Sequence, residues 1–224
     1  MAHDAIQRSL LQIWFSPAFP VGGFAYSHGL EFAVEAGAVH DRETLQGWIA
    51  SLLVHGSAQA DAAVIAAAWQ AMRGERAQTV ADVAEFSAAL QPSAERYFEA
   101  TTLGRAFMDA VLASWPMPEL AAVAAIDALT YPAAVGIAAA AHKIDLTLTL
   151  EAYTLAFVSS QTSAAIRLGV IGQTDGQRII AALLPDIHAV AAAPCDLDQI
   201  GACTFAADLA SILHESQYSR LFRS

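Results

Sequence analysis

The sequence predicts an all-α protein, a single-domain bundle of roughly ten helices with no sheet. Alanine, the best helix-forming residue, is concentrated in three stretches, at 58–71, 121–128 and 133–141. Residues with β-branched side chains, which favour strands, are too sparse to sustain a sheet. Hydrophobic residues make up 56% of the 224 positions and charged residues 15%. The chain is therefore expected to bury a core and is not intrinsically disordered.

In the first half of the chain, prolines and capping residues set the expected helix ends. Pro17 pushes the residue before it out of the helical region, so the first helix stops at Ser16. Asp41, Thr79 and Ser93 are each suited to cap a helix, because their side chains can accept a hydrogen bond from the first turn. We expect helices at 4–15, at 27–36, from Asp41 to His55, at 58–72, at 79–90 and at 93–114.

The second half continues in the same way. Pro132 lies in the first turn of a helix, where its missing N–H matters least. The stretch 146–168 is apolar on most sides, which is typical of a helix in the middle of a bundle. Thr174 and Gln177 have the spacing of a capping box, and Pro185 is expected to kink or stop the helix that they begin. We expect helices at 119–129, from 131, at 146–168, from 174 and at 205–214, with a loop at 194–201.

The excess of acidic residues argues against nucleic acid and anionic membranes as binding partners. The chain has 11 basic and 22 acidic residues, a net charge of −11 at pH 7, and Lys143 is its single lysine. A surface that follows phosphates needs clustered Lys and Arg, so we expect no nucleic acid and no anionic membrane as partner. The acidic field favours a basic protein partner or a nearby cation.

No targeting or membrane segment is expected. The chain starts without a basic region followed by an apolar run, which predicts no signal peptide. Residues 120–141 are mostly alanine and include Asp127 and Pro132, so they indicate packed core helices and not a membrane span. Cys195 and Cys203 cannot form a disulfide framework, and a cytoplasmic location is therefore expected.

A search for catalytic chemistry finds no signature. No serine lies in a G-x-S-x-G elbow, no histidine pair has H-E-x-x-H or i, i+4 spacing, and GQTDGQR at 172–178 lacks the phosphate-loop pattern. We predict no catalytic residue, no cofactor and no metal site within one chain, although a symmetric dimer could pool a single His or Cys from each copy. The histidines considered were His3, His28, His40, His55, His142, His188 and His214.

The connection at 16–31, SPAFPVGGFAYSHGLE, is unusual for a link between helices. Its Gly22-Gly23 pair lets the backbone turn sharply or approach another surface closely. Aromatic side chains surround the glycines. The segment is either a contact surface or a well-packed helix connection.

The tail at 215–224, ESQYSRLFRS, is set apart from the helical body at 1–214. Ten residues at a terminus cannot fold independently. The tail is either a frayed end that packs loosely or a docking segment that orders on a partner, since Tyr and Arg are favoured interface anchors.

Five blocks of this sequence resemble, in order, those of a known family. They are LLQIWFSPAFPVGGFAYSHGLE at 10–31, AERYFEATTLGRAF at 94–107, YPAAVGIAAAAHKI at 131–144, FVSSQTSAAIRLGVIGQTDGQR at 157–178 and DLASILHESQYSRLFRS at 208–224. Along nearly its whole length the chain resembles the UreF family of urease accessory proteins.

The resemblance implies an all-α homodimer that is not an enzyme and that assists nickel insertion into apo-urease. Such a protein joins the accessory protein UreD, or UreH, to the GTPase UreG, whose GTP binding and hydrolysis drive nickel delivery. The alternative is a direct nickel-carrying chaperone with His and Cys ligands pooled across the dimer.

The tail carries the clearest match to the family. The resemblance implies that Tyr218, Leu221 and Phe222 fill pockets on UreD or UreH, while Arg220 and Arg223 pair with carboxylates or carbonyls.

The glycine-containing segment is implied to be the GTPase face, or a dimer edge that shapes it. The residues proposed for it are Gly22, Gly23, Tyr26, Ser27 and Glu31.

Two residues depart from the family pattern, in which a smaller apolar residue and a glutamine are common. They are Phe19 and His28. We interpret His28 as a neutral replacement, with a local addition near a nickel route as the alternative.

Overall fold

The computed structural model describes residues 2–201 and 204–224. The side chain of His3 and all of Cys203, both considered above as metal ligands, lie outside the described part. Within it the chain forms eleven α-helices, two short 3₁₀ helices and no strand, which confirms the all-α prediction. The elements are α1 (Ala2–Trp14), η1 (Gly23–Ala25), α2 (Leu30–Glu35), α3 (Arg42–His55), α4 (Ser57–Met72), α5 (Val80–Ala89), α6 (Ala94–Ser114), α7 (Pro118–Val123), α8 (Tyr131–Ala141), α9 (Leu146–Arg167), α10 (Gln173–Ala192), η2 (Leu197–Gln199) and α11 (Phe205–His214).

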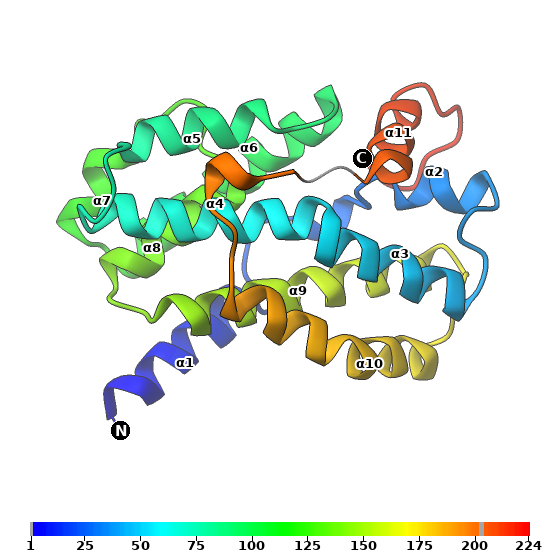
Figure 1. Ribbon diagram of the computed structural model, residues 1–224, viewed down its shortest axis with the longest axis horizontal. Helices are drawn as coiled ribbons and strands as arrows, with labels where there is room; N and C mark the ends of the chain where they lie inside the picture. The colour runs from blue at the N-terminus through cyan, green and yellow to red at the C-terminus, as the bar shows by residue number, and fades with distance from the viewer. Residues whose placement is uncertain (1, 202–203) are drawn as a thin grey trace.

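The helices α3 and α4 follow one another across the middle of the molecule, with α5 and α6 on one side and α9 and α10 on the other (Figure 1). The first helix projects at one corner. The C-terminus lies beside α11 and α2 at the opposite end of the molecule (Figure 1). The last residues of the chain therefore meet the segment that follows the glycine pair, although nearly 200 positions separate them in the sequence.

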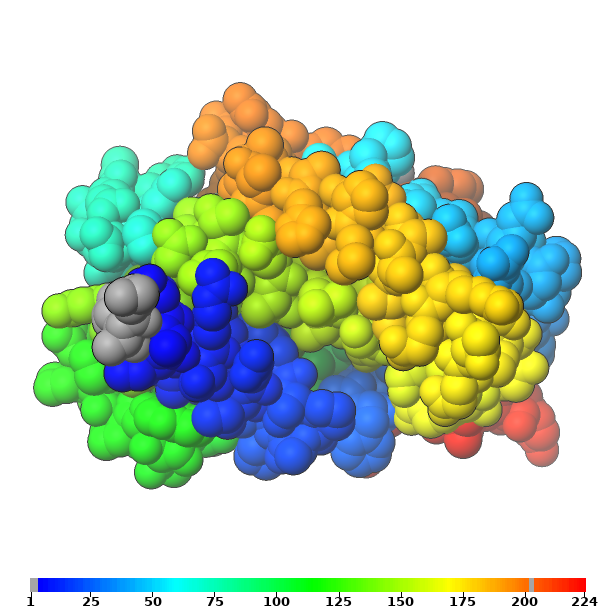
Figure 2. Space-filling model, turned by 90° about the horizontal axis from the view of Figure 1, so that it is seen from below, coloured from blue at the N-terminus to red at the C-terminus, as the bar shows by residue number. Residues whose placement is uncertain are grey.

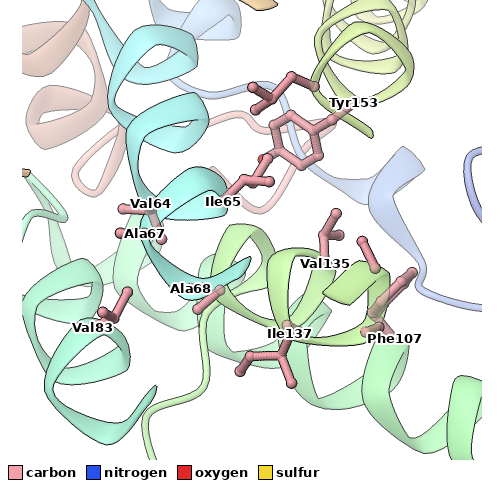
Figure 3. Packing of buried hydrophobic residues seen from close by; sticks show 14 of the residues in the cluster. Val64, Ile65, Ala67, Ala68, Val83, Phe107, Val135, Ile137 and Tyr153 are labelled. Atoms are coloured by element: carbon pink, nitrogen blue, oxygen red, sulfur yellow. The ribbon is translucent and has the colours of Figure 1, made fainter. Parts of the chain in front are cut away.

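A first core cluster packs α8 against α4 and α6. Figure 3 shows Ile65 of α4 facing this cluster together with Val135 and Ile137 of α8 and Phe107 of α6. Gly136 lets the two backbones come close, because a Cβ at that position would lie 2.5 Å from the carbonyl oxygen of Ile65. The alanine-rich stretches at 58–71 and 133–141 are thus contact surfaces between closely packed helices. The stretch at 121–128, which was also expected to form core helix, has no buried residue.

A second cluster joins α2, α3, α9, α10 and α11. The helix α9 is buried between its neighbours, as its apolar character predicts. One apolar stretch, Arg42–Met72, is long enough to cross a membrane, but 61% of its most apolar window is buried inside the fold. It has the pattern of a core helix.

The predicted caps of three helices are confirmed. Asp41 and Thr79 each form a capping box, with Thr44 and Asp82 respectively, and the Ser93 hydroxyl accepts the first-turn N–H of α6. These interactions join residues three positions apart, so local sequence was sufficient to find them.

Two helices are clearly shorter than predicted. The helix expected from Ser27 begins at Leu30, because His28 and Gly29 adopt left-handed backbone angles (φ 56° and 77°). The helix expected over 119–129 ends at Val123, and the chain after it runs through turns to Leu129 and Thr130, whose backbone lies against Gly104 of α6.

In α10 the predicted capping box is wrong. The helix already begins at Gln173, after Gly172, which offers no side-chain cap, so Thr174 lies inside it. Pro185 does not stop this helix either, and α10 runs on to Ala192. Pro185 is exposed, so water can hydrate the carbonyl that it leaves without a partner.

Candidate functional site

The segment after the glycine pair is folded into the body. Gly22 has φ 80°, the left-handed conformation that a glycine adopts without strain, whereas Gly23 begins the short helix η1 and has no positive φ. Phe24 in η1 points outward and is 74% exposed. Tyr26 and Ser27, which follow it, are buried. Only the tip of this segment is therefore available at the surface.

The tail is held by the backbone of this segment. The Ser27 N–H and hydroxyl both donate to the carbonyl oxygen of Ser224, at 2.7 and 2.5 Å. The Arg223 N–H donates to the carbonyl oxygen of Ala25 at 2.8 Å. These contacts tie the last two residues to positions 25–27.

Glu31, at the start of α2, holds the preceding turn of the tail. Its two carboxylate oxygens accept the N–H groups of Leu221 and Phe222, at 2.6 and 2.9 Å. The Phe222 ring is buried and lies under the guanidinium of Arg167, 4.3 Å from it, and Arg167 also donates to the carbonyl oxygen of Phe24. The tail is thus ordered on its own chain and is not a frayed end.

A buried charged cluster lies beneath these contacts. Glu99 of α6 accepts hydrogen bonds from Arg96 (2.5 Å) and the hydroxyl of Ser224 (2.6 Å), and its other oxygen lies 2.7 Å from His28 Nε2. Burial alone would raise the pKa of Glu99, but Arg96 and then His28 and Ser224 lower it to about 2. Glu99 is therefore an anion that joins the loop to the end of the tail.

A second buried carboxyl has the opposite character. Asp61 of α4 accepts a hydrogen bond from the Tyr153 hydroxyl at 2.7 Å. Burial raises the pKa of Asp61, and the hydrogen bond from Tyr153 and the charge of Arg96 only partly offset this effect. Burial and the neighbouring Asp61 also raise the pKa values of Tyr131 and Tyr153, which stay protonated.

These polar groups line the floor of a cavity of about 950 Å³. Its walls come from the segment 16–24 and from α9, with aromatic side chains such as Phe15 and Phe157. Figure 2 shows this face hollowed between the N-terminal segment and α9. The cavity is open to solvent on one side, so it is a groove of the isolated chain.

The described residues contain no group of three His, Cys, Asp or Glu side chains placed to hold a metal ion. The two carboxylates at His214 lie on its two different ring nitrogens, so the three groups do not converge on one point. Cys195 is half-buried, and burial raises the pKa of its thiol, which disfavours the thiolate that binds metals. His28 faces a single carboxylate.

The structure brings the two predicted residue groups together. Of the loop group, Gly22 and Gly23 are half-buried, while Tyr26, Ser27 and Glu31 lie inside. Ser27 and Glu31 hold the tail. Their assignment to a partner face stays a prediction, and it now applies to the tip formed by 22–24.

Of the tail group, Tyr218 is fully exposed, Leu221 is 63% exposed, and Arg220 and Arg223 are at the surface. Phe222 instead fills a pocket of its own chain. Its ring covers apolar surface beneath Arg167, so it is not available to a partner in this arrangement. Its assignment to a pocket on UreD or UreH stays a prediction.

Sequence reasoning missed the groups that receive the tail. They are Glu95, Arg96, Glu99, Arg167 and His214. One signal was available: Arg96 and Glu99 share the helix face of Leu103 and Phe107, which is otherwise the core face of α6. Charged residues on a core face indicate a buried ion pair.

An apolar surface lies next to the tail. The buried face of α11 carries Ala207, Ala210, Ser211 and His214. Its opposite face carries Phe205, Leu209 and Ile212, at i, i+4 and i+7, all exposed. This row, together with Tyr218 and Leu221, is named here the α11–tail surface. A row of exposed large apolar groups on one helix face is typical of a contact with another protein.

Comparisons with known proteins agree on one family. The family model UreF matches residues 39–184. A urease accessory protein UreF of Bradyrhizobium sp. (strain BTAi1 / ATCC BAA-1182) is 49% identical over 225 residues, covering 99% of this chain and 93% of the relative. That of Rhodopseudomonas palustris (strain HaA2) is 48% identical, covering 96% and 92%. That of Xanthobacter autotrophicus (strain ATCC BAA-1158 / Py2) is 47% identical, covering 94% and 88%.

Proposed function

The chain belongs to the UreF family of urease accessory proteins, and we propose that it acts as a scaffold for nickel insertion into apo-urease. In this role it bridges the accessory protein UreD, or UreH, and the GTPase UreG in the cytoplasm. It works as a homodimer and modulates GTP-dependent nickel delivery. It supplies binding surfaces and no catalytic group of its own.

The observation that carries the proposal is the α11–tail surface. The tail is held by three carboxylates: Glu31 binds its backbone, Glu95 binds the Arg220 side chain, and Glu99 binds its last residue. Tyr218 and Leu221 therefore stay directed outward. A tail fixed in this way is already ordered before it binds. Preorganised aromatic and aliphatic anchors beside an apolar helix face suit the docking of UreD or UreH, because little conformational entropy is then lost on binding.

The tip at 22–24 and the adjoining groove support the second contact. Gly22, Gly23 and the exposed Phe24 lie at the mouth of the groove, which has an apolar wall and a polar floor. We assign this side to the GTPase UreG or to the edge of the homodimer. The tip belongs to a different segment from Phe205, Leu209 and Ile212 of α11, so each partner is assigned its own contact residues.

Removing the outward anchors tests the docking role. We expect Tyr218→Ala combined with Leu221→Ala to weaken the complex with UreD or UreH at least about tenfold, as loss of interface anchors does. Size-exclusion chromatography with light scattering and a titration by calorimetry measure the effect. These variants are cleaner than deletion of the tail, which would also remove the hydrogen bonds that the tail donates to Glu31 and Glu99.

Phe86→Ala is the matched control, because Phe86 is also an exposed aromatic residue but lies on α5. We expect it to leave the complex intact. Unchanged binding by the double variant would place the docking surface elsewhere and refute the assignment.

A nickel titration of the isolated chain separates the scaffold from the nickel-carrying alternative. The scaffold role predicts no tight site. Stoichiometric binding at one site per dimer, lost on substitution of His28, Cys195 or Cys203, would instead support a carrier.

A further inference from the structure

His214, in the last turn of α11, is completely buried between two carboxylates. Its Nδ1 lies 2.6 Å from an oxygen of Glu95, and its Nε2 lies 3.2 Å from an oxygen of Glu31. A neutral imidazole has one N–H and one lone pair, so it could satisfy only one of these acceptors. The geometry is satisfied when each ring nitrogen carries a proton.

The two carboxylates are less favourable sites for that proton than the imidazole. The two oxygens of Glu31 already accept the backbone N–H groups of 221–222, one each. The second oxygen of Glu95 accepts from Arg220 at 2.5 Å. A carboxyl proton that does not point at one of these N–H donors would lie in a hydrogen bond to His214. There the imidazole is the stronger base, and Arg220 favours the ionised form of Glu95. The extra proton therefore belongs to His214, as an imidazolium between two anions.

The wider charge distribution also favours the imidazolium. The acidic groups on the elements around it outnumber the two arginines, and a cation completes the balance. The charged groups are Glu31 and Glu35 on α2, Glu95, Arg96 and Glu99 on α6, Asp208 on α11, and Glu215 and Arg220 in the tail.

We propose that His214 is a proton-operated latch for the tail. With a proton on each ring nitrogen it holds Glu31 and Glu95 in place, and these carboxylates hold the backbone at 221–222 and the Arg220 side chain. Loss of one proton turns a lone pair toward a buried carboxylate, and the repulsion loosens the tail. The latch is thus closed at lower pH and opens as the pH rises.

The consequence is control over the α11–tail surface. An open latch frees Phe222 and removes the fixed orientation of Tyr218 and Leu221, so docking should weaken at alkaline pH. This consequence rests on the proposed scaffold function, but the latch itself is a property of the isolated chain.

His28 offers a matched control. Its Nε2 lies 2.7 Å from Glu99, but its buried Nδ1 has no hydrogen-bond partner. One N–H is sufficient there, so the contact does not require an imidazolium. Glutamine at position 28 can supply the same single N–H.

The test is an NMR titration of the full-length chain without partners, from about pH 6 to about pH 9, the range in which histidines change charge. The ¹⁵N shifts of the imidazole report how many ring nitrogens of His214 are protonated. Hydrogen exchange of the Leu221 and Phe222 amides, corrected for intrinsic rates, reports tail closure. Both are measured for the wild type, His214→Gln and His28→Gln.

We expect both nitrogens of His214 to be protonated at neutral pH. Protection of the two amides should fall at least about tenfold over the pH range in which His214 loses a proton. This dependence should persist in His28→Gln and disappear in His214→Gln. A single-proton imidazole throughout, amide protection that does not change with pH, or a dependence that persists in His214→Gln would each overturn the latch. Because no partner is present, none of these results depends on the docking role.

Discussion

Glu99 is predicted to be one of the most important single side chains for the stability of this protein. It is 2% exposed and receives Arg96, His28 and Ser224, three groups from three separate parts of the chain. The perturbation we choose is Glu99→Gln, which keeps the shape of the side chain and removes its charge. The variant leaves the guanidinium of Arg96 buried without an anion.

Two arguments give similar magnitudes for this loss. The pKa of Glu99 falls from 4.5 to about 2, and this difference corresponds to about 3 kcal/mol of folding stability at neutral pH. Breaking a buried ion pair by removing one partner costs about 3–5 kcal/mol. We therefore expect Glu99→Gln to lower the free energy of unfolding by about 3 kcal/mol at pH 7.

The pH dependence provides a second, independent signature. Because folding lowers the pKa of Glu99, its contribution is fully present above the pKa of the unfolded chain, near 4.5. It is lost as the pH falls toward about 2, where the folded-state carboxyl is protonated. The deficit of the variant should therefore shrink as the pH is lowered.

Urea denaturation followed by circular dichroism, at neutral and at acidic pH, measures both effects. The control is Glu75→Gln, which removes the ion pair between Arg73 and Glu75. This pair has a similar length, 2.6 Å, but the two side chains are 41% and 46% exposed. Exposed pairs contribute about 0–1 kcal/mol, so little change is expected there. A loss at Glu99 as small as that at Glu75, or a loss that does not depend on pH, would refute the reasoning.

Two further predictions concern the core. Gly136→Ala should lower the free energy of unfolding by about 1–3 kcal/mol, because the new methyl group would lie 2.5 Å from a backbone oxygen of α4. Gly47→Ala in α3 should raise it by about 1 kcal/mol, because there is open space around Gly47 and alanine favours a helix. Thermal unfolding of both variants checks the pair, and the same sign for both would contradict the packing argument. Asp61→Asn should stabilise the protein above neutral pH. Folding raises the pKa of Asp61, so the wild type loses stability as the pH rises and the buried carboxyl must ionise. The asparagine carries no charge, and its amide oxygen can still accept the hydrogen bond from Tyr153. A variant less stable than the wild type at pH 8 would show that the Asp61 charge is needed.

The sequence predicted which residue types form the candidate site, but not which of their side chains lie inside and which lie at the surface. The tail was identified by its apolar and basic residues, and Tyr218 and Leu221 do lie outward. Phe222 has the same apolar character, yet its ring is buried under Arg167. Which of three apolar side chains turns inward depends on the second core cluster and on Arg167 of α9, and no local pattern in the tail encodes that pocket.

The late start of α2 has the same cause. His28 and Gly29 leave the helical conformation because α11 crosses at that point, and a Cβ on Gly29 would lie 2.8 Å from the Ser211 nitrogen. Such a close approach between distant segments has no signature near residue 29.

The sequence by itself determined the helical class, most helix positions, three caps and the family, because these depend on propensity, on interactions three or four residues apart and on ordered motifs. The tertiary structure decided that Glu31, Glu95, Glu99 and His214 meet the tail. Buried charges are stable only when partners from other helices surround them, and those partners come together only when the bundle has folded.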